Sequence, residues 1–158
     1  MVWGQEVTFQ SDFAGNIAFN SQQVISLAEA IPQDLYDWAP SDGVRSVSQA
    51  IMHIASANYF LSTLMGGEIP EGVDPMSMET ITDKEIVIEE LKKSYQFLSE
   101  TGQSVQDETM NDMINFPPIG QDLSRRSFML IAVGHCWEHL GQLIAYARSN
   151  EIVPPWSQ

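Results

Sequence analysis

Two of the three histidines in this chain of 158 residues stand four positions apart, at His135 and His139. In a helix this spacing separates two side chains by about 40° around the axis and about 6 Å along it, so both imidazoles can reach one point. The third histidine, His53, lies in another strongly apolar segment, residues 44–65, which is predicted to be helical. Three nitrogen donors from two helices predict a site for one divalent transition metal ion.

Such a site leaves coordination positions open for water or a substrate, as in catalytic rather than structural zinc centres. Imidazole ligands suit several metals, and we expect Zn²⁺ or Ni²⁺, with Fe²⁺, Mn²⁺ and Co²⁺ as alternatives. A simpler interpretation competes with this one. The three histidines could be ordinary core residues that only need hydrogen-bond partners, because buried imidazoles must be satisfied in either case.

The residues around the histidine pair suggest further roles. His135 to His139 spells H-x-x-E-H, the motif of inverted zinc peptidases, in which the glutamate is the general base. A peptidase is disfavoured because only 19 residues follow His139 and Glu151 is the sole acid among them. Glu138 is instead expected to accept a hydrogen bond from an imidazole or to lie at the rim. Gln142, one turn beyond His139, is expected to line the pocket, and these two residues are the catalytic candidates.

Four other residues near the pair have weaker interpretations. Cys136 lies about 100° from His135 around the helix, so it is predicted to be a small buried hydrophobe, with a thiolate nucleophile as the alternative. Tyr146, Arg148 and Trp156 could line or close an entrance to the site, although packing of the C-terminal segment explains Trp156 equally well.

The apolar periodicity and the breakers predict an all-α protein. Helices are expected over residues 9–30, 44–65, 82–102 and 124–149, with one short turn possible over 32–38. Thr82 to Glu85 is interpreted as a capping box, Gly102 as a helix end, and no strand with convincing alternation is found. Four helices predict a four-helix bundle as a single domain over residues 1–158. The linkers on both sides of the third helix are long enough to cross the bundle.

Composition narrows the classes of partner. The net charge of −14 and the lack of clustered basic residues argue against nucleic acid and anionic membranes. Residues 1–6 lack the pattern of a secretory signal, and no apolar run approaches the roughly 20 residues that span a bilayer. One cysteine fits a reducing compartment, so a cytoplasmic location is expected.

Several stretches resemble the DinB-like family of small metalloproteins. The strongest is His135-x-x-Glu138-His139-x-Gly141-Gln142, flanked by residues 124–128 and 146–157; residues 38–40, 45–47 and 53–54 match more weakly. The resemblance implies a metal-ligand role for His53, His135 and His139, a four-helix bundle with long crossover connections, and a homodimer. It also implies kinship with thiol-dependent transferases and isomerases, although many members of the family have no known activity.

Two functions are therefore expected. The first is a metalloenzyme, either a metal-dependent hydrolase or a thiol S-transferase, which activates water or a low-molecular-weight thiol against a small substrate. The second is a non-catalytic, metal-binding, stress-related helical protein. The chain has only four arginines, and the sequence predicts no cationic cluster that would hold an anionic thiol.

Overall fold

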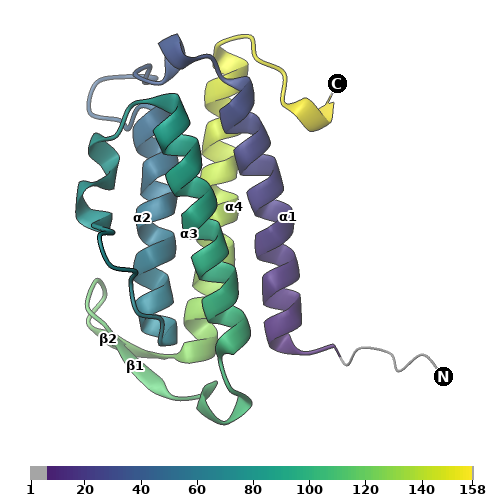
Figure 1. Cartoon of the computed structure of the whole chain (residues 1–158), viewed down its shortest axis with the longest axis vertical. Coiled ribbons are helices and arrows are strands. Elements are labelled where there is room, and N and C mark those ends of the chain that lie inside the picture. Colours follow the sequence, from purple (N-terminus) through teal and green to yellow (C-terminus); the bar gives the residue numbers. More distant parts are fainter. Residues whose placement is uncertain (1–6, 158) are drawn as a thin grey trace, which may run out of the picture.

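The structure is a computed structural model, and it describes residues 7–157. Four long helices run along one axis, which confirms the prediction of an all-α bundle (Figure 1). They are α1 (Phe9–Ala30), α2 (Val47–Met65), α3 (Lys84–Ser104) and α4 (Arg125–Ser149). The short elements are the 3-10 turns η1 (Gln33–Leu35), η2 (Pro75–Thr80), η3 (Asp107–Thr109) and η4 (Pro155–Ser157), and the strands β1 (Met113–Phe116) and β2 (Gln121–Ser124). The expectation about a secretory signal in residues 1–6 lies outside the described residues.

Local capping explains where the helices begin. The Ser46 hydroxyl accepts from the Gln49 amide, so α2 begins three residues later than the predicted start at residue 44. Asp83, and not Thr82, caps α3, because its carboxylate accepts from the amides of Glu85 and Ile86. The predicted capping box at Thr82 is therefore wrong by one residue, since the acidic side chain is the better acceptor for two amides.

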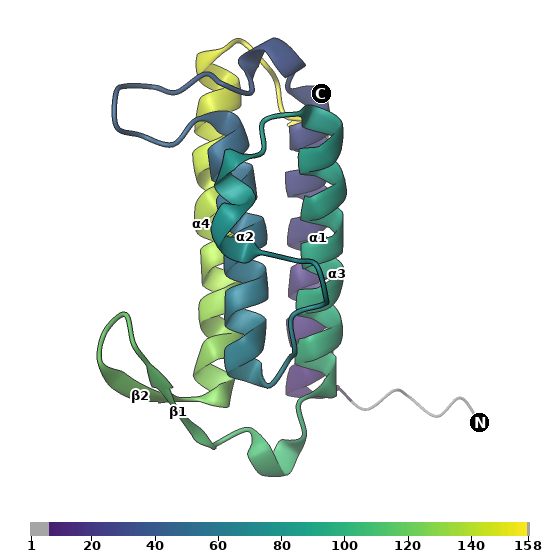
Figure 2. The same ribbon diagram turned by 60° about the vertical axis from the view of Figure 1, so that its left-hand side comes forward.

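The helices form a four-membered ring in which α1 and α2 lie on one diagonal and α3 and α4 on the other. Each of α1 and α2 packs against both α3 and α4. Figure 1 shows that α2 and α3 point the same way, so the chain must return along the bundle between them. The segment from residue 66 to residue 83, here called the crossover, makes this return and holds η2 against α2 (Figure 2). This is the expected long crossover.

The second long linker stays at one end of the bundle and contains the two strands that the sequence analysis did not find. β1 and β2 pair antiparallel, with Ile114 opposite Leu123 and Phe116 opposite Gln121. The Phe116 ring packs edge-on against Phe128 of α4, with ring centroids 5.4 Å apart. Strands of four residues are too short to show a reliable alternation, and this pair depends on its contact with the bundle.

A polar layer crosses the core with one residue from each helix. The Tyr95 hydroxyl of α3 donates to Asn20 of α1 at 2.7 Å, and the Cys136 thiol of α4 contacts the Asn58 amide oxygen of α2 at 3.5 Å. Cys136 is fully buried, as predicted. Burial raises the pKa of its thiol to about 12, although a hydrogen bond with Tyr95 opposes the shift. A thiol held protonated in this way does not support the alternative of a thiolate nucleophile.

Candidate metal centre

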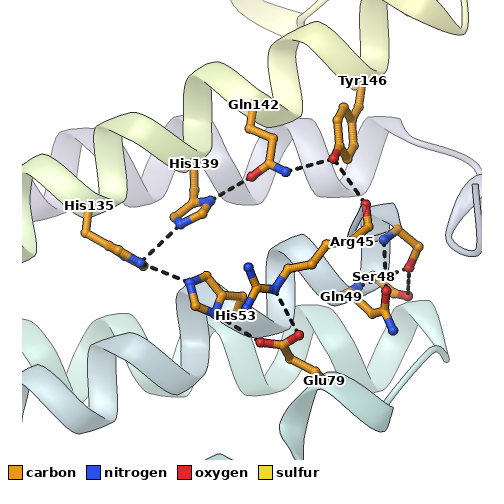
Figure 3. A network of polar contacts seen from close by, with 10 residues as sticks. Arg45, Ser48, Gln49, His53, Glu79, His135, His139, Gln142 and Tyr146 are labelled. Atoms are coloured by element: carbon orange, nitrogen blue, oxygen red, sulfur yellow. Dashed lines mark hydrogen bonds and ion pairs between the residues drawn. The ribbon is translucent and has the colours of Figure 1, made fainter. Parts of the chain in front are cut away.

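The three histidines come together between two neighbouring antiparallel helices. His53 projects from α2, and His135 and His139 project from α4 toward it (Figure 3). The Nε2 atom of His135 lies 3.2 Å from Nε2 of His53 and 3.1 Å from Nε2 of His139. The nitrogen atoms that the three rings offer all lie within 4.8 Å of one another. The spacing of the pair and the apolar setting of His53 therefore led to one cluster, and these three residues could hold a metal ion.

A carboxylate fixes the proton position of His53. Nδ1 of His53 lies 3.0 Å from Oε1 of Glu79, while Nε of Arg45 donates to Oε2 of the same carboxylate at 2.9 Å. An ionised carboxylate can only accept, so His53 carries its proton on Nδ1 and leaves a lone pair on Nε2. Glu79 belongs to η2, so the crossover brings this acceptor to the site.

A chain of three hydrogen bonds fixes the proton position of His139. The Tyr146 hydroxyl donates to the carbonyl oxygen of Arg45 at 3.1 Å, so it accepts from Nε2 of Gln142 at 2.7 Å. The amide oxygen of Gln142 must then face His139, where it accepts from Nδ1 at 2.7 Å. His139, like His53, therefore directs an Nε2 lone pair toward the centre of the cluster.

This arrangement fits a bound cation better than three free imidazoles. The Nε2 atom of His135 contacts the Nε2 lone pairs of both His53 and His139. It can donate at most one proton, so at least one of these two contacts is between two lone pairs. Two nitrogens bound to one tetrahedral zinc lie about 3.3 Å apart, given Zn–N bonds of about 2.0–2.1 Å. The two separations that involve His135 are close to that value, and all three nitrogens lie within 4.8 Å of one another. A cation at the meeting point would satisfy all three lone pairs.

Burial favours the neutral form of two of the imidazoles. Burial lowers the pKa of His135 to about 3, with smaller contributions from His139, His53 and Arg45. Burial, followed by Arg45 and His139, also lowers the pKa of His53, although Glu79 acts in the opposite direction. Neutral imidazole is the form that binds metals. Burial alone would raise the pKa of Glu79, but the hydrogen bond and charge of Arg45, then those of His53, outweigh it and hold the pKa below its ordinary value.

The remaining candidates from the sequence divide into residues near the cluster and residues away from it. Gln142 and Tyr146 lie beside the cluster and contact it through the chain described above. Glu138 is exposed and forms no hydrogen bond with the three imidazoles. Arg148 lies in the last turn of α4, and Trp156 belongs to η4, which packs against α1. Neither of these two residues takes part in the polar network around the histidines.

Sequence reasoning missed Glu79 and the role of Arg45. Glu79 lies 26 residues after His53 in a linker without periodicity, and only the path of the crossover makes them neighbours. Arg45 was noted as one of four scattered arginines and as part of a weakly matching stretch, but not as a partner of the site. In the structure it binds Glu79 through its side chain and Tyr146 through its carbonyl group. A lone acid in a linker of this kind gives no sequence signal, because acids are common on solvated loops.

An apolar pocket opens directly beside the cluster. Its volume is about 480 Å³, and His53 forms part of its wall. Ser56, Ala57 and Phe60 of α2 continue this wall, and the crossover forms the opposite side. This volume falls within the range of roughly 300–1,000 Å³ that is usual for small-molecule sites.

A helical bundle with a crossover and a three-histidine cluster between two helices defines a class of small proteins with a candidate metal site. The sequence profile of the DinB superfamily matches residues 17–143. The chain therefore belongs to the DinB superfamily, as the resemblance implied. A search of curated proteins found no match.

Solved structures share the fold at low sequence identity. A DinB-like protein from Bacillus cereus superposes with a TM-score of 0.76 at 14% identity, covering 90% of this chain and 93% of that chain. A DinB-like protein (YjoA) from Bacillus subtilis gives 0.72 at 20% identity, covering 93% and 97%. A conserved protein from Enterococcus faecalis gives 0.70 at 14% identity, covering 90% and 97%. At these identities the similarity establishes the fold alone.

Proposed function

We propose that the chain is a metal-dependent enzyme in which His53, His135 and His139 hold one divalent ion, Zn²⁺ or Ni²⁺, beside a substrate pocket. The observation that carries the proposal is the convergence of the three Nε2 atoms, with the protons of two rings fixed on the far nitrogen. Hydrogen bonds that orient ligand imidazoles in this way are the usual surroundings of metal sites.

A divalent ion held there supplies Lewis acidity, which lowers the pKa of a water or thiol that reaches it and polarises a carbonyl group. The chain's own residues prepare the site for this chemistry. Glu79 and Gln142 hold the Nδ1 protons of His53 and His139, so the opposite nitrogens stay available as ligands. The ion pair of Arg45 with Glu79 keeps that carboxylate ionised and in place.

The pocket favours the enzyme over the non-catalytic alternative. A site for metal storage or sensing needs no pocket for a substrate. Here His53 belongs to the histidine cluster and also lines a cavity large enough for a small molecule. Between the two reactions, activation of water has fewer requirements, because the residues that line the pocket include no cationic group for an anionic thiol. We therefore propose hydrolysis first and thiol transfer second.

Elemental analysis tests the site. Protein purified without a histidine tag is expected to contain about one ion per chain, and removal of the ion by a chelator should lower the melting temperature. His135→Ala should abolish stoichiometric metal, whereas Glu138→Gln, in the same helix but without contact to the imidazoles, should retain it. Full metal in His135→Ala, or a wild-type protein that neither contains nor takes up metal, would overturn the proposal.

Turnover distinguishes the enzyme from the alternative. Metal-loaded and metal-stripped protein should be compared on neutral aryl esters, with and without dithiothreitol as a simple thiol. Metal-dependent ester cleavage supports the hydrolase, and dependence on dithiothreitol as well supports thiol transfer. A stoichiometric metal with no turnover across a broad ester panel would favour the non-catalytic protein.

A further inference from the structure

The pocket beside His53 is formed by two segments far apart in the sequence. One wall is a stripe of α2 that continues from His53 through Ala57 to Phe60. The other wall comes from the crossover and contains Ile69, Pro75 and Met76. Since Met76 lies three residues before Glu79, the same short segment both lines the pocket and supplies the acceptor for His53.

Large apolar side chains are left open to solvent around this hollow. Met76 is 91% exposed, Phe60 41% and Ile69 37%, although they surround one cavity. Apolar side chains that converge on one cavity without covering one another mark a place where a ligand would remove them from water. A ligand that filled this cavity would be covered largely by carbon atoms.

The polar groups of the lining are few and carry no fixed charge. They are His53 and the hydroxyls of Ser56 and Thr63, and the Thr63 hydroxyl already donates to the Phe60 carbonyl. The Ser56 hydroxyl forms no hydrogen bond with another described residue, and it lies one turn from His53 on the same helix. The net charge of the chain is −14, and the residues that line the pocket include no lysine or arginine to pair with an anion.

We propose that this pocket binds the substrate, and that the substrate is a small, neutral, mostly apolar molecule such as an aryl or branched-alkyl compound. Its single polar group points toward the histidine cluster, within reach of the free Ser56 hydroxyl. This inference rests on the proposed function for the role of the cluster, but the binding itself depends only on the pocket. It predicts that anionic low-molecular-weight thiols bind poorly at this wall.

Two fluorescent probes that differ by one charged group test the inference. N-phenyl-1-naphthylamine is neutral, and 8-anilino-1-naphthalenesulfonate has the same ring skeleton with an added sulfonate. We expect the neutral probe to bind at least tenfold more tightly. Equal or tighter binding of the sulfonated probe would overturn the assignment of a neutral ligand.

Pocket variants locate the bound probe. Ala57→Trp fills the cavity and should weaken binding of the neutral probe at least tenfold, while the metal content stays unchanged. Phe60→Ala removes part of the wall and should also weaken binding. The matched control is Phe19→Ala, which removes a phenylalanine that is 56% exposed on α1, and it should have no effect. If Phe19→Ala weakens binding as much as Phe60→Ala, the probe binds elsewhere and the inference fails.

A third variant separates this inference from the proposed function. His135→Ala is expected to lose the metal and still bind the neutral probe, because His135 does not line the pocket. A wild-type protein that binds the probe but neither contains nor takes up metal would support the pocket and contradict the metal centre. A protein that contains stoichiometric metal but does not bind the neutral probe would support the metal centre and contradict the pocket.

Discussion

At the scale of single residues, the cluster is defined as much by the partners of the histidines as by the histidines themselves. Glu79 orients His53, and Gln142 orients His139, so both rings present the same nitrogen to the centre. His135 differs, because its Nδ1 atom is buried without a hydrogen-bond partner among the described residues. The orientation of His135 therefore depends on packing, whereas the other two rings are fixed by specific acceptors.

The Tyr146 hydroxyl is expected to matter for metal affinity although it contacts no ligand nitrogen. Without it, the Gln142 amide loses the partner that fixes its orientation, and it can turn its NH₂ group toward His139. We expect Tyr146→Phe to weaken Zn²⁺ binding about tenfold, the lower end of the range for partners of metal ligands. Competition with a chromophoric chelator measures the change.

Tyr36→Phe is the matched control for this variant. The Tyr36 hydroxyl is also buried and donates to the Ala28 carbonyl at 2.9 Å, away from the cluster. This variant should lower the free energy of unfolding by about 1 kcal/mol and leave the metal affinity unchanged. Similar metal affinities in the two variants would mean that Tyr146 does not orient the site.

The placement of His135 beside His139 was predictable because it depends on local geometry. His135 and His139 share a helix, and their relative position follows from the helical repeat alone. Gln142 was predictable for the same reason, since it stands three residues beyond His139. Glu79 was not, because its distance from His53 is set by the path of a linker with no periodic pattern. Glu138 satisfied the sequence motif, yet its side chain points to solvent.

At the scale of elements, the helices followed from the sequence and the connections did not. The predicted bounds of the first helix agree with the structure at both ends, where Thr8 caps the first turn and Pro32 follows the last. The third helix continues past the predicted end at Gly102 to Ser104. Gly102 does not stop the helix; it lies against the ring of Phe13 where α1 and α3 pack closely. Glycine is thus used here for packing.

Two glycine substitutions test this interpretation, because they are expected to change the free energy of unfolding in opposite directions. In Gly102→Ala the new methyl group would overlap the buried Phe13 ring, so we expect a loss of about 1–3 kcal/mol in the free energy of unfolding. Gly15→Ala places a methyl group in open space within α1, and we expect a gain of about 1 kcal/mol from helix propensity. Urea unfolding measures both changes. A gain in both variants would show that the contact between Gly102 and Phe13 is not close.

At the scale of the whole molecule, the crossover joins the fold to the site. It makes α2 and α3 parallel, and the same segment lines the apolar pocket and supplies Glu79. No helix among residues 7–157 is long and apolar enough to cross a membrane. The bundle was predictable from the helix count, and the long linkers allowed the crossover that the family resemblance implied. Which linker crosses was not, because both were long enough.

The lowered pKa values predict how the metal-free protein responds to acid. The pKa of His135 falls from about 6.5 in the unfolded chain to about 3 in the folded one. Between these values the unfolded chain binds a proton that the folded chain does not, so the free energy of unfolding falls as the pH falls. The lowered pKa of His53 acts in the same direction.

Urea unfolding of metal-free protein at about pH 7.5 and about pH 5.5 measures this effect, and His135→Ala is the reference. The wild-type protein should lose more stability between the two conditions than His135→Ala does. Comparing the two proteins cancels the general effect of acid on a chain of net charge −14. Equal losses in both would show that His135 does not titrate with a lowered pKa.

The histidine cluster is built from only two of the four helices, and this has an evolutionary consequence. The histidines come from α2 and α4, and no described residue of α1 or α3 takes part in the polar network around them. Mutations in α1 and α3 are constrained mainly by core volume, which many sequences can satisfy. The crossover lies on the outside of α2, where insertions are tolerated because lengthening a surface segment costs little entropy. Substitutions in the crossover alone could therefore change which ligand the pocket of such a bundle binds, while the histidines keep their positions.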